Sequence, residues 1–204
     1  MALLPRRTVT AALVALPFCW TGARAQQPAA RRLTPAQTEG PFYPVALPQD
    51  SDGDLLRNGS RRYAHGQPAW VAGVVTDLEG KPVSGAQVEI WQCDHAGHYH
   101  HPGDGSRADA DFQGFGRVTV GADGRYRFRT IRPVPYTGRT PHIHVKVKLD
   151  RRELLTTQLY VEGEPNNERD GLWRSLGEQR SLVTVPFRAT SDGLQANFPI
   201  VIAA

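Results

Sequence analysis

Residues 142–149 read His142-Ile143-His144-Val145-Lys146-Val147-Lys148-Leu149, and this strict alternation is the clearest structural signal in the chain. Side chains point alternately to the two faces of a β-strand, so the aliphatic residues share one face and the histidines and lysines share the other. The period of two predicts a strand whose aliphatic face lies in a core. On the opposite face, His142 and His144 are close enough for both imidazoles to reach one metal ion.

Seven more short runs rich in β-branched and aromatic residues surround this strand, with glycine-containing turns at 78–82 and 121–124 between them. The eight expected strands cover residues 70–76, 86–93, 116–120, 125–131, 142–149, 154–161, 181–187 and 194–202. Helical periodicity is nearly absent, and only residues 165–176 could form a helical turn or two. The pattern predicts an all-β chain with a single β-sandwich domain.

Residues 1–25 have the features of an export signal peptide. Arg6 and Arg7 precede an apolar run at 11–20, and Ala23-Arg24-Ala25 resembles a signal-peptidase site. The paired arginines favour the twin-arginine export route, and the apolar run is shorter than the roughly 20 residues that a transmembrane helix needs. We therefore expect a periplasmic or extracellular protein without a membrane span in its mature form.

Removal of this leader changes the charge balance and the cysteine content. It removes three arginines and no acidic residue, so the formal net charge falls from +4 to +1. A nucleic-acid partner would require a basic face, and the near-neutral mature chain argues against one. Cys93 is then the only cysteine, so an internal disulfide is excluded.

The mature chain divides into two parts by composition. Residues 26–63 are rich in Pro, Gln, Asp and Gly, and we expect an extended N-terminal arm that wraps a domain or a partner instead of forming core. Residues 64–204 form the expected sandwich. Two long loops, 95–113 and the proline-stiffened 132–141, project from it, and long loops on a β scaffold are common places for functional sites.

Both loops carry a tyrosine that could join the histidines. Tyr136 lies six residues before His142, and Tyr99 follows the expected strand 86–93. Taken singly, each tyrosine is more often an ordinary loop residue, and a lone His-x-His is more often a solvated strand face. If all four side chains converge, the pair of phenols favours ferric iron, because a phenol with a pKa of about 10 binds as phenolate only to a strongly charged cation.

Tyr126 differs from these two tyrosines. It alternates with Phe128 while the arginines at 125, 127 and 129 take the other face, so we expect it in the core.

An ordered set of motifs extends over most of residues 38–161 and begins with Thr-Glu-Gly-Pro-Phe-Tyr-Pro at 38–44. Its other parts are residues 73–77, 85–94, 112–116, 126–136, 139–144 and 157–160. This set resembles the intradiol ring-cleavage dioxygenases, above all the β-chain type of the protocatechuate 3,4-dioxygenase branch.

This resemblance implies a fold, a cofactor and a reaction. The metal ligands would be Tyr99, Tyr136, His142 and His144, holding one non-haem Fe(III) per chain. Arg139 would stabilise negative charge on the ring carbon that oxygen attacks, with Gln158 and Tyr160 beside the same pocket. The enzyme would cleave a small catechol-type diol with O2, insert both oxygen atoms and release a cis,cis-muconate-type diacid. It could act as a homo-oligomer or with a related partner chain.

Two other interpretations remain open at the level of sequence. The pattern from Gly73 to Ile90 also occurs in non-catalytic secreted β-sandwich modules that bind carbohydrate. Alternatively, His142 and His144 with a carboxylate could bind zinc or ferrous iron, in the arrangement of two histidines and one carboxylate.

Overall fold

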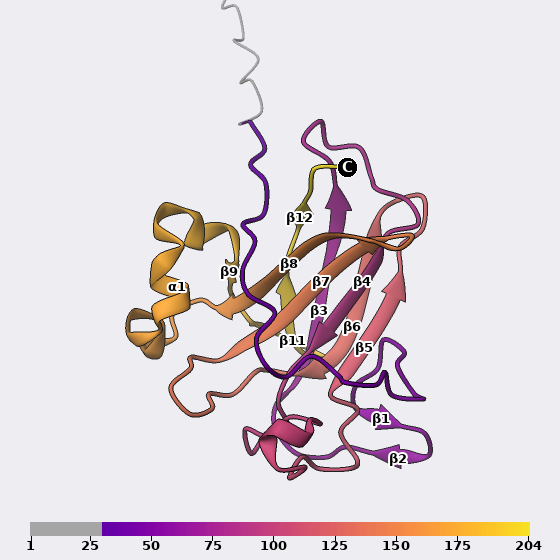
Figure 1. The fold of residues 1–204 in the computed structure, drawn as a ribbon, viewed down its shortest axis with the longest axis vertical. Coiled ribbons are helices and arrows are strands. Elements are labelled where there is room, and N and C mark those ends of the chain that lie inside the picture. Colours follow the sequence, from indigo (N-terminus) through magenta and orange to yellow (C-terminus); the bar gives the residue numbers. More distant parts are fainter. Residues whose placement is uncertain (1–29) are drawn as a thin grey trace, which may run out of the picture.

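The computed structural model describes residues 30–204, and these residues form two five-stranded sheets packed face to face (Figure 1). The first sheet contains β10 (Arg188–Thr190), β11 (Gly193–Asn197), β3 (Pro68–Thr76) and β12 (Ile200–Val201), with β6 (Arg125–Ile131) on the other side of β3. The second contains, in order, β5 (Phe115–Thr119), β4 (Gln87–Trp91), β7 (His142–Leu149), β8 (Arg152–Val161) and β9 (Thr184–Val185). The predicted β-sandwich is confirmed.

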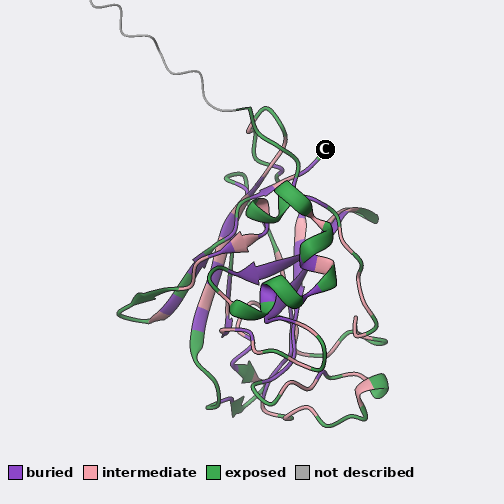
Figure 2. Ribbon diagram, turned by 90° about the vertical axis from the view of Figure 1, so that its left-hand side faces the viewer, coloured by how far each residue is buried: buried purple, intermediate pink, exposed green. Residues whose placement is uncertain are grey.

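Alternate side chains of the two sheets fill the space between them. Val71 on β3 and Phe128 on β6 meet Val145 on β7 and Ile90 on β4 in one continuous buried cluster. In Figure 2, buried residues follow the central strands, whereas the helical segment and the loop tips are mostly exposed. Tyr126 belongs to this core, as the sequence predicts, and its hydroxyl donates a hydrogen bond to the Phe198 carbonyl.

The C-terminal third departs from the strand pattern that we expected. Residues 181–187 do not form one strand, because a 3-10 helix (Gly177–Leu182) occupies their start and only β9 remains. The run 194–202 is split into β11 and β12, both parallel to β3. Pro199 lies in the break and has no N–H to donate to a ladder. The expected helical segment consists of a 3-10 helix (Pro165–Arg169) and α1 (Gly171–Ser175).

The N-terminal segment lies along the outer face of the second sheet (Figure 1). The Gln37 N–H donates to the Thr156 carbonyl at 2.8 Å, and the Pro35 carbonyl accepts from the Thr157 hydroxyl at 2.7 Å. These two contacts lie at the edge of β8; further along, the Glu39 carboxylate accepts from Lys146 Nζ and the Thr38 carbonyl accepts from the Gln158 amide. Residues 38–43 thereby cover the polar face of β7, which the alternation alone would leave in solvent. The aliphatic and the histidine-bearing faces of β7 are both buried from His142 to Val147.

The same N-terminal segment also contributes to the core. Leu55 and Leu56 belong to the main hydrophobic cluster, so this part of residues 26–63 packs inside the domain. A small hairpin of β1 (Arg57–Asn58) and β2 (Arg61–Arg62) follows. The predicted signal peptide, residues 1–25, lies outside the described residues. Within residues 30–204, no helix has the length and apolar character needed to cross a membrane.

Gly73 provides a test of the packing between β3 and the C-terminal strands. A Cβ placed on Gly73 would lie 2.0 Å from the Phe198 carbonyl oxygen, and a backbone atom cannot move away as a side chain can. We expect Gly73→Ala to lower the free energy of unfolding by about 3 kcal/mol or more, because overpacking against backbone forces the strands apart. Chemical denaturation measures this change. An unchanged denaturation midpoint would contradict the close approach.

Candidate metal centre

Strand β7 presents two histidines at the centre of the site. His142 pairs across the sheet with Tyr160 on β8, and His144 lies between Gln158 on β8 and Trp91 on β4. Both imidazoles are 1% exposed, and their Nε2 atoms are 3.2 Å apart. Two residues that are distant from solvent therefore direct one nitrogen each towards the same point.

Two loops bring tyrosines to the same point. The Tyr136 hydroxyl lies 3.5 Å from His142 Nε2. The Tyr99 ring packs edge-on against Tyr136, with ring centroids 5.3 Å apart, and its centroid is 6.0 Å from that of His144. The structure thus brings together all four side chains that the sequence singled out as metal ligands.

Short polar contacts hold each tyrosine loop in shape. The Asp94 carboxylate accepts from the N–H groups of Ala96 and His98, and the Asp104 carboxylate accepts from the Tyr99 N–H at 2.8 Å. The Tyr136 loop closes through the Arg139 N–H, which donates to the Tyr136 carbonyl at 2.9 Å. These turns fix the direction of each phenol before any ligand binds.

Arg139 connects the tyrosine to the neighbouring strand and helix. Its guanidinium donates to the Asp170 carboxylate at 2.8 Å, to the Gln158 side-chain oxygen at 2.6 Å and to the Tyr136 hydroxyl at 3.4 Å. Tyr160 donates to the same Gln158 oxygen at 3.0 Å. Gln158 thus joins Arg139 to Tyr160, and the Tyr160 ring also lies beside that of His142, with centroids 6.0 Å apart.

Burial sets the protonation of the four candidate ligands. Desolvation, together with the nearby Arg139 charge, lowers the pKa of His142 to about 4, and burial lowers the pKa of His144 well below its usual value. The imidazoles are neutral at physiological pH. Burial also raises the pKa of Tyr99 well above its usual value and raises that of Tyr136, which Arg139 partly opposes. Only a strongly charged cation would displace the phenolic protons.

The hydrogen bonds of these groups suit a metal ion. His142 Nδ1 lies 2.7 Å from the Thr140 carbonyl and must donate to it, so the Nε2 lone pair of His142 faces the centre. The Tyr99 hydroxyl is buried and has no hydrogen-bond partner among residues 30–204. Buried polar atoms are rarely left unpaired. A cation bound between two phenolates and two imidazoles would give both His142 Nε2 and the Tyr99 oxygen a partner. This donor set fits a hard trivalent ion.

The structure gives less support to the alternative in which His142 and His144 share a metal ion with a carboxylate. In the part of the chain that the structure describes, no three His, Cys, Asp or Glu side chains gather in a way that could hold a metal ion. The buried Asp170 carboxylate near Arg139 also accepts from the Thr140 N–H and caps the start of α1. It is therefore held away from the histidine pair by its own partners.

Sequence reasoning missed three residues that support the site. Asp170 orients Arg139, and its place before Gly171-Leu172-Trp173 is a typical helix N-cap signal that could have identified it. Trp91 stacks on the His144 ring at 4.8 Å with an interplanar angle of 9°. Phe42 stacks on Tyr99 at 4.7 Å. No local pattern indicates the last two, because both contacts join segments that are distant in the sequence.

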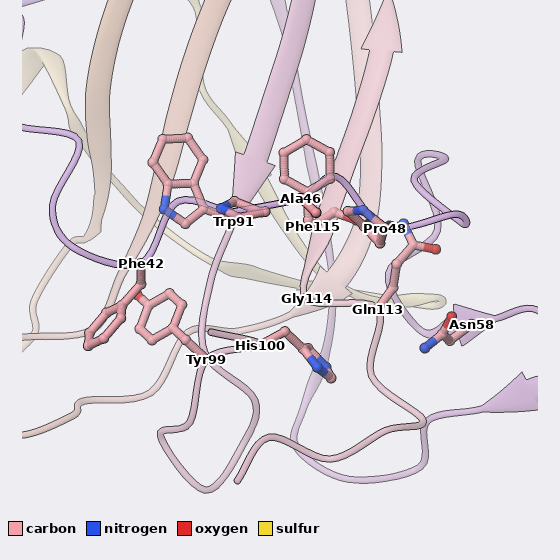
Figure 3. A pocket seen from close by; sticks show the side chains of 11 residues that line it. Phe42, Ala46, Pro48, Asn58, Trp91, Tyr99, His100, Gln113, Gly114 and Phe115 are labelled. Atoms are coloured by element: carbon pink, nitrogen blue, oxygen red, sulfur yellow. Dashed lines mark hydrogen bonds between the residues drawn. The ribbon is translucent and has the colours of Figure 1, made fainter. Parts of the chain in front are cut away.

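Two hollows flank the centre. The first, of about 120 Å³, is bounded by Phe42, Trp91, Tyr99, His100 and Phe115 (Figure 3). The second, of about 360 Å³, is open to solvent beside Tyr136 and Arg139, with Asn166 and Arg169 at its rim. A small aromatic molecule could therefore approach the four side chains along Tyr136 and Arg139.

Comparison with known proteins gives a consistent result for most of the chain. The family model described as "Dioxygenase" matches residues 38–203. Hydroxyquinol 1,2-dioxygenase of Corynebacterium glutamicum is 33% identical over 186 residues, which cover 78% of this chain and 58% of that protein. The protocatechuate 3,4-dioxygenase beta chain of Burkholderia cepacia is 37% identical over 170 residues, covering 74% and 71%. The chain thus spans little more than half the length of the hydroxyquinol relative.

A solved structure agrees with these matches. The dioxygenase domain of a dioxygenase–carbohydrate-binding protein fusion from Streptomyces sp. SirexAA-E superposes with a TM-score of 0.67 and 34% identity. The superposition covers 83% of this chain and 97% of that domain.

Proposed function

The chain belongs to the intradiol ring-cleavage dioxygenase family, and from this membership we propose that it cleaves a small catechol-type diol with O2. The bond broken would lie between the two hydroxylated carbons, and the product would be a cis,cis-muconate-type diacid. The observation that carries the proposal is the convergence of two phenols, one buried and one half-buried, and two neutral imidazoles on one point.

We propose that Tyr99, Tyr136, His142 and His144 hold one non-haem ferric ion per chain. When bound, this ion supplies the Lewis acidity that activates the diol towards oxygen. Two phenolates would offset two of its three positive charges, and the neutral imidazoles would add none. The buried, partly aromatic surroundings exclude water from the reacting groups and strengthen their electrostatic interactions.

The surrounding residues would move protons and stabilise charge. The Tyr136 oxygen, half-buried at the edge of the open hollow, would as a phenolate accept a proton from a diol hydroxyl and become the neutral phenol. The Arg139 guanidinium, 3.4 Å from the Tyr136 oxygen, would stabilise negative charge on the ring as oxygen attacks. Gln158 and Asp170 fix the direction of this guanidinium, and Tyr160 holds Gln158.

Colour and oxygen consumption test the proposal together. We expect the purified holoprotein to be red-brown, because phenolate-to-ferric charge transfer absorbs visible light, and to contain one iron per chain. Oxygen uptake with catechol, protocatechuate, hydroxyquinol and larger lignin-derived diols would identify the substrate. The chelator-treated protein should be colourless and inactive. A colourless protein with stoichiometric zinc and no oxygen uptake would refute the assignment.

We further propose that residues 1–25 direct export by the twin-arginine route, so that the folded metalloprotein acts in the periplasm or outside the cell. The support is Arg6 and Arg7 before a short apolar run. Replacing both arginines by lysine should retain the protein in the cytoplasmic fraction. Export of that variant at the normal level would favour the general secretory route.

A further inference from the structure

A cluster of charged residues lies between the N-terminal segment and the outer face of the second sheet, and the proposed chemistry does not use it. Glu89 on β4 is 0% exposed, and its carboxylate accepts from the Tyr43 hydroxyl at 2.9 Å and from Lys148 Nζ at 3.0 Å. Lys146 on β7 is 4% exposed. Buried charges are costly unless they are paired, so this cluster is not an ordinary solvated strand face.

Lys146 contacts two carboxylates that come from different parts of the fold. Glu39 belongs to the N-terminal segment, and its carboxylate accepts from Lys146 Nζ. Glu153 belongs to β8, and its carboxylate lies 3.1 Å from the same nitrogen. Only the first of these pairs joins the N-terminal segment to the sheet.

We call residues 38–43 the strap, and its two anchors are the contacts of Glu39 with Lys146 and of Tyr43 with Glu89. Between Glu39 and Tyr43 it places Gly40 and Phe42 directly against two of the proposed metal ligands. A Cβ on Gly40 would lie 3.3 Å from His144 Cε1, and Gly40 has a φ of +75°. The Phe42 ring stacks on Tyr99 with centroids 4.7 Å apart.

The Tyr43 anchor reaches the same histidine by a second route. The Tyr43 ring packs edge-on against Trp91, with centroids 5.0 Å apart, and Trp91 is stacked on His144. The strap therefore contacts His144 from one side through Gly40 and supports it from another through Trp91. At its start, the Thr38 carbonyl accepts from the Gln158 amide at 3.1 Å.

We propose that the strap positions His144 and Tyr99, and that its two polar anchors, Glu39–Lys146 and Tyr43–Glu89, control how firmly the centre retains its metal ion. This inference rests on the proposed function, because it concerns the ion proposed there. Glu39 and Tyr43 are positioning residues, since neither is among the four side chains that converge on the centre. Residues that orient metal ligands without binding the metal commonly change metal affinity by about 10- to 100-fold.

The two carboxylates on Lys146 provide a matched pair of variants. Glu39→Gln removes the carboxylate charge that anchors the strap to Lys146. Glu153→Gln removes the other carboxylate charge beside Lys146 and leaves the strap unchanged. We expect a chelator to remove iron from Glu39→Gln about tenfold faster than from the parent, measured as loss of visible absorption, and from Glu153→Gln at close to the parent rate. Tyr43→Phe keeps the ring against Trp91 but loses the bond to Glu89, and it should also release iron faster.

A measurement on the metal-free protein makes the test independent of iron. Amide hydrogen exchange in residues 38–43 should be faster in Glu39→Gln than in the parent and in Glu153→Gln, because a loosened segment opens more often. Thermal unfolding should give similar midpoints for the two variants, which would show that the fold is intact.

The possible outcomes separate the strap from the proposed function. If the parent is coloured and its Glu39→Gln variant releases iron at the parent rate, the proposal that the strap controls metal retention is overturned. Equal acceleration in both glutamate variants would overturn it as well, because the Lys146 charge and not the strap would then be responsible. A parent that binds no iron would refute the proposed function. In that case, unchanged hydrogen exchange of residues 38–43 in Glu39→Gln would still overturn the proposal about the strap.

Discussion

Tyr99→Phe is expected to fold at least as stably as the parent protein and yet to lose ring cleavage and the red-brown colour. The change removes one buried hydroxyl that has no hydrogen-bond partner in residues 30–204. Leaving a buried polar group unsatisfied costs about 1–3 kcal/mol, so its removal should be neutral or stabilising for the metal-free protein. The phenylalanine keeps the ring that stacks on Phe42.

The functional loss should be large, because this phenol is proposed as an anionic ligand that no neighbouring group can replace. We expect kcat/KM to fall at least a thousandfold, roughly 4 kcal/mol of transition-state stabilisation, if any iron is retained. Iron content, visible absorption and oxygen uptake measure this loss, and denaturation of the metal-free protein measures the stability.

Tyr126→Phe is the matched control for this prediction. Tyr126 is also a buried tyrosine, but its hydroxyl donates to the Phe198 carbonyl in the core, away from the centre. Its removal should cost about 1 kcal/mol of stability and leave the colour and the activity unchanged. A coloured, active Tyr99→Phe protein would show that Tyr99 is not a ligand.

Arg139→Met should give the second largest effect, with the metal retained but the reaction slowed. Losing one preorganised donor to developing negative charge commonly lowers kcat about 10²- to 10³-fold, and we expect a loss of that order. The pKa of Tyr136 should rise further, because the Arg139 charge lowers it in the parent. Visible absorption and iron content should stay close to those of the parent, whereas kcat from oxygen uptake should fall.

Two comparison variants distinguish a directed guanidinium from a general positive charge. Arg139→Lys keeps the charge but cannot reach Asp170, Gln158 and Tyr136 together, so it should recover only a small part of the rate. Arg169→Gln alters an exposed arginine at the rim of the same hollow and should leave kcat nearly unchanged. Full activity in Arg139→Lys would contradict the role assigned to the three contacts.

Much of the fold could be predicted because strand alternation is a local property. The aliphatic face of β7 and the core position of Tyr126 follow from a period of two, and the structure has both. The prediction failed where the interruption is subtle, as in residues 194–202, where Pro199 splits one expected strand into two. A single missing N–H donor changes the ladder without changing the hydrophobic pattern.

The sequence by itself determined which residue types could form the site: two histidines on one strand face, a tyrosine in each of two long loops, and an arginine three residues before the first histidine. Only the tertiary structure decided that these groups meet in a buried place. Alternation predicts a polar, solvated face for His142 and His144, and this face becomes buried because residues 38–43, about a hundred residues earlier in the chain, cover it. Burial by a distant segment has no local signal, and for the same reason the contacts that Trp91 and Glu39 make at this site appeared only in the folded chain.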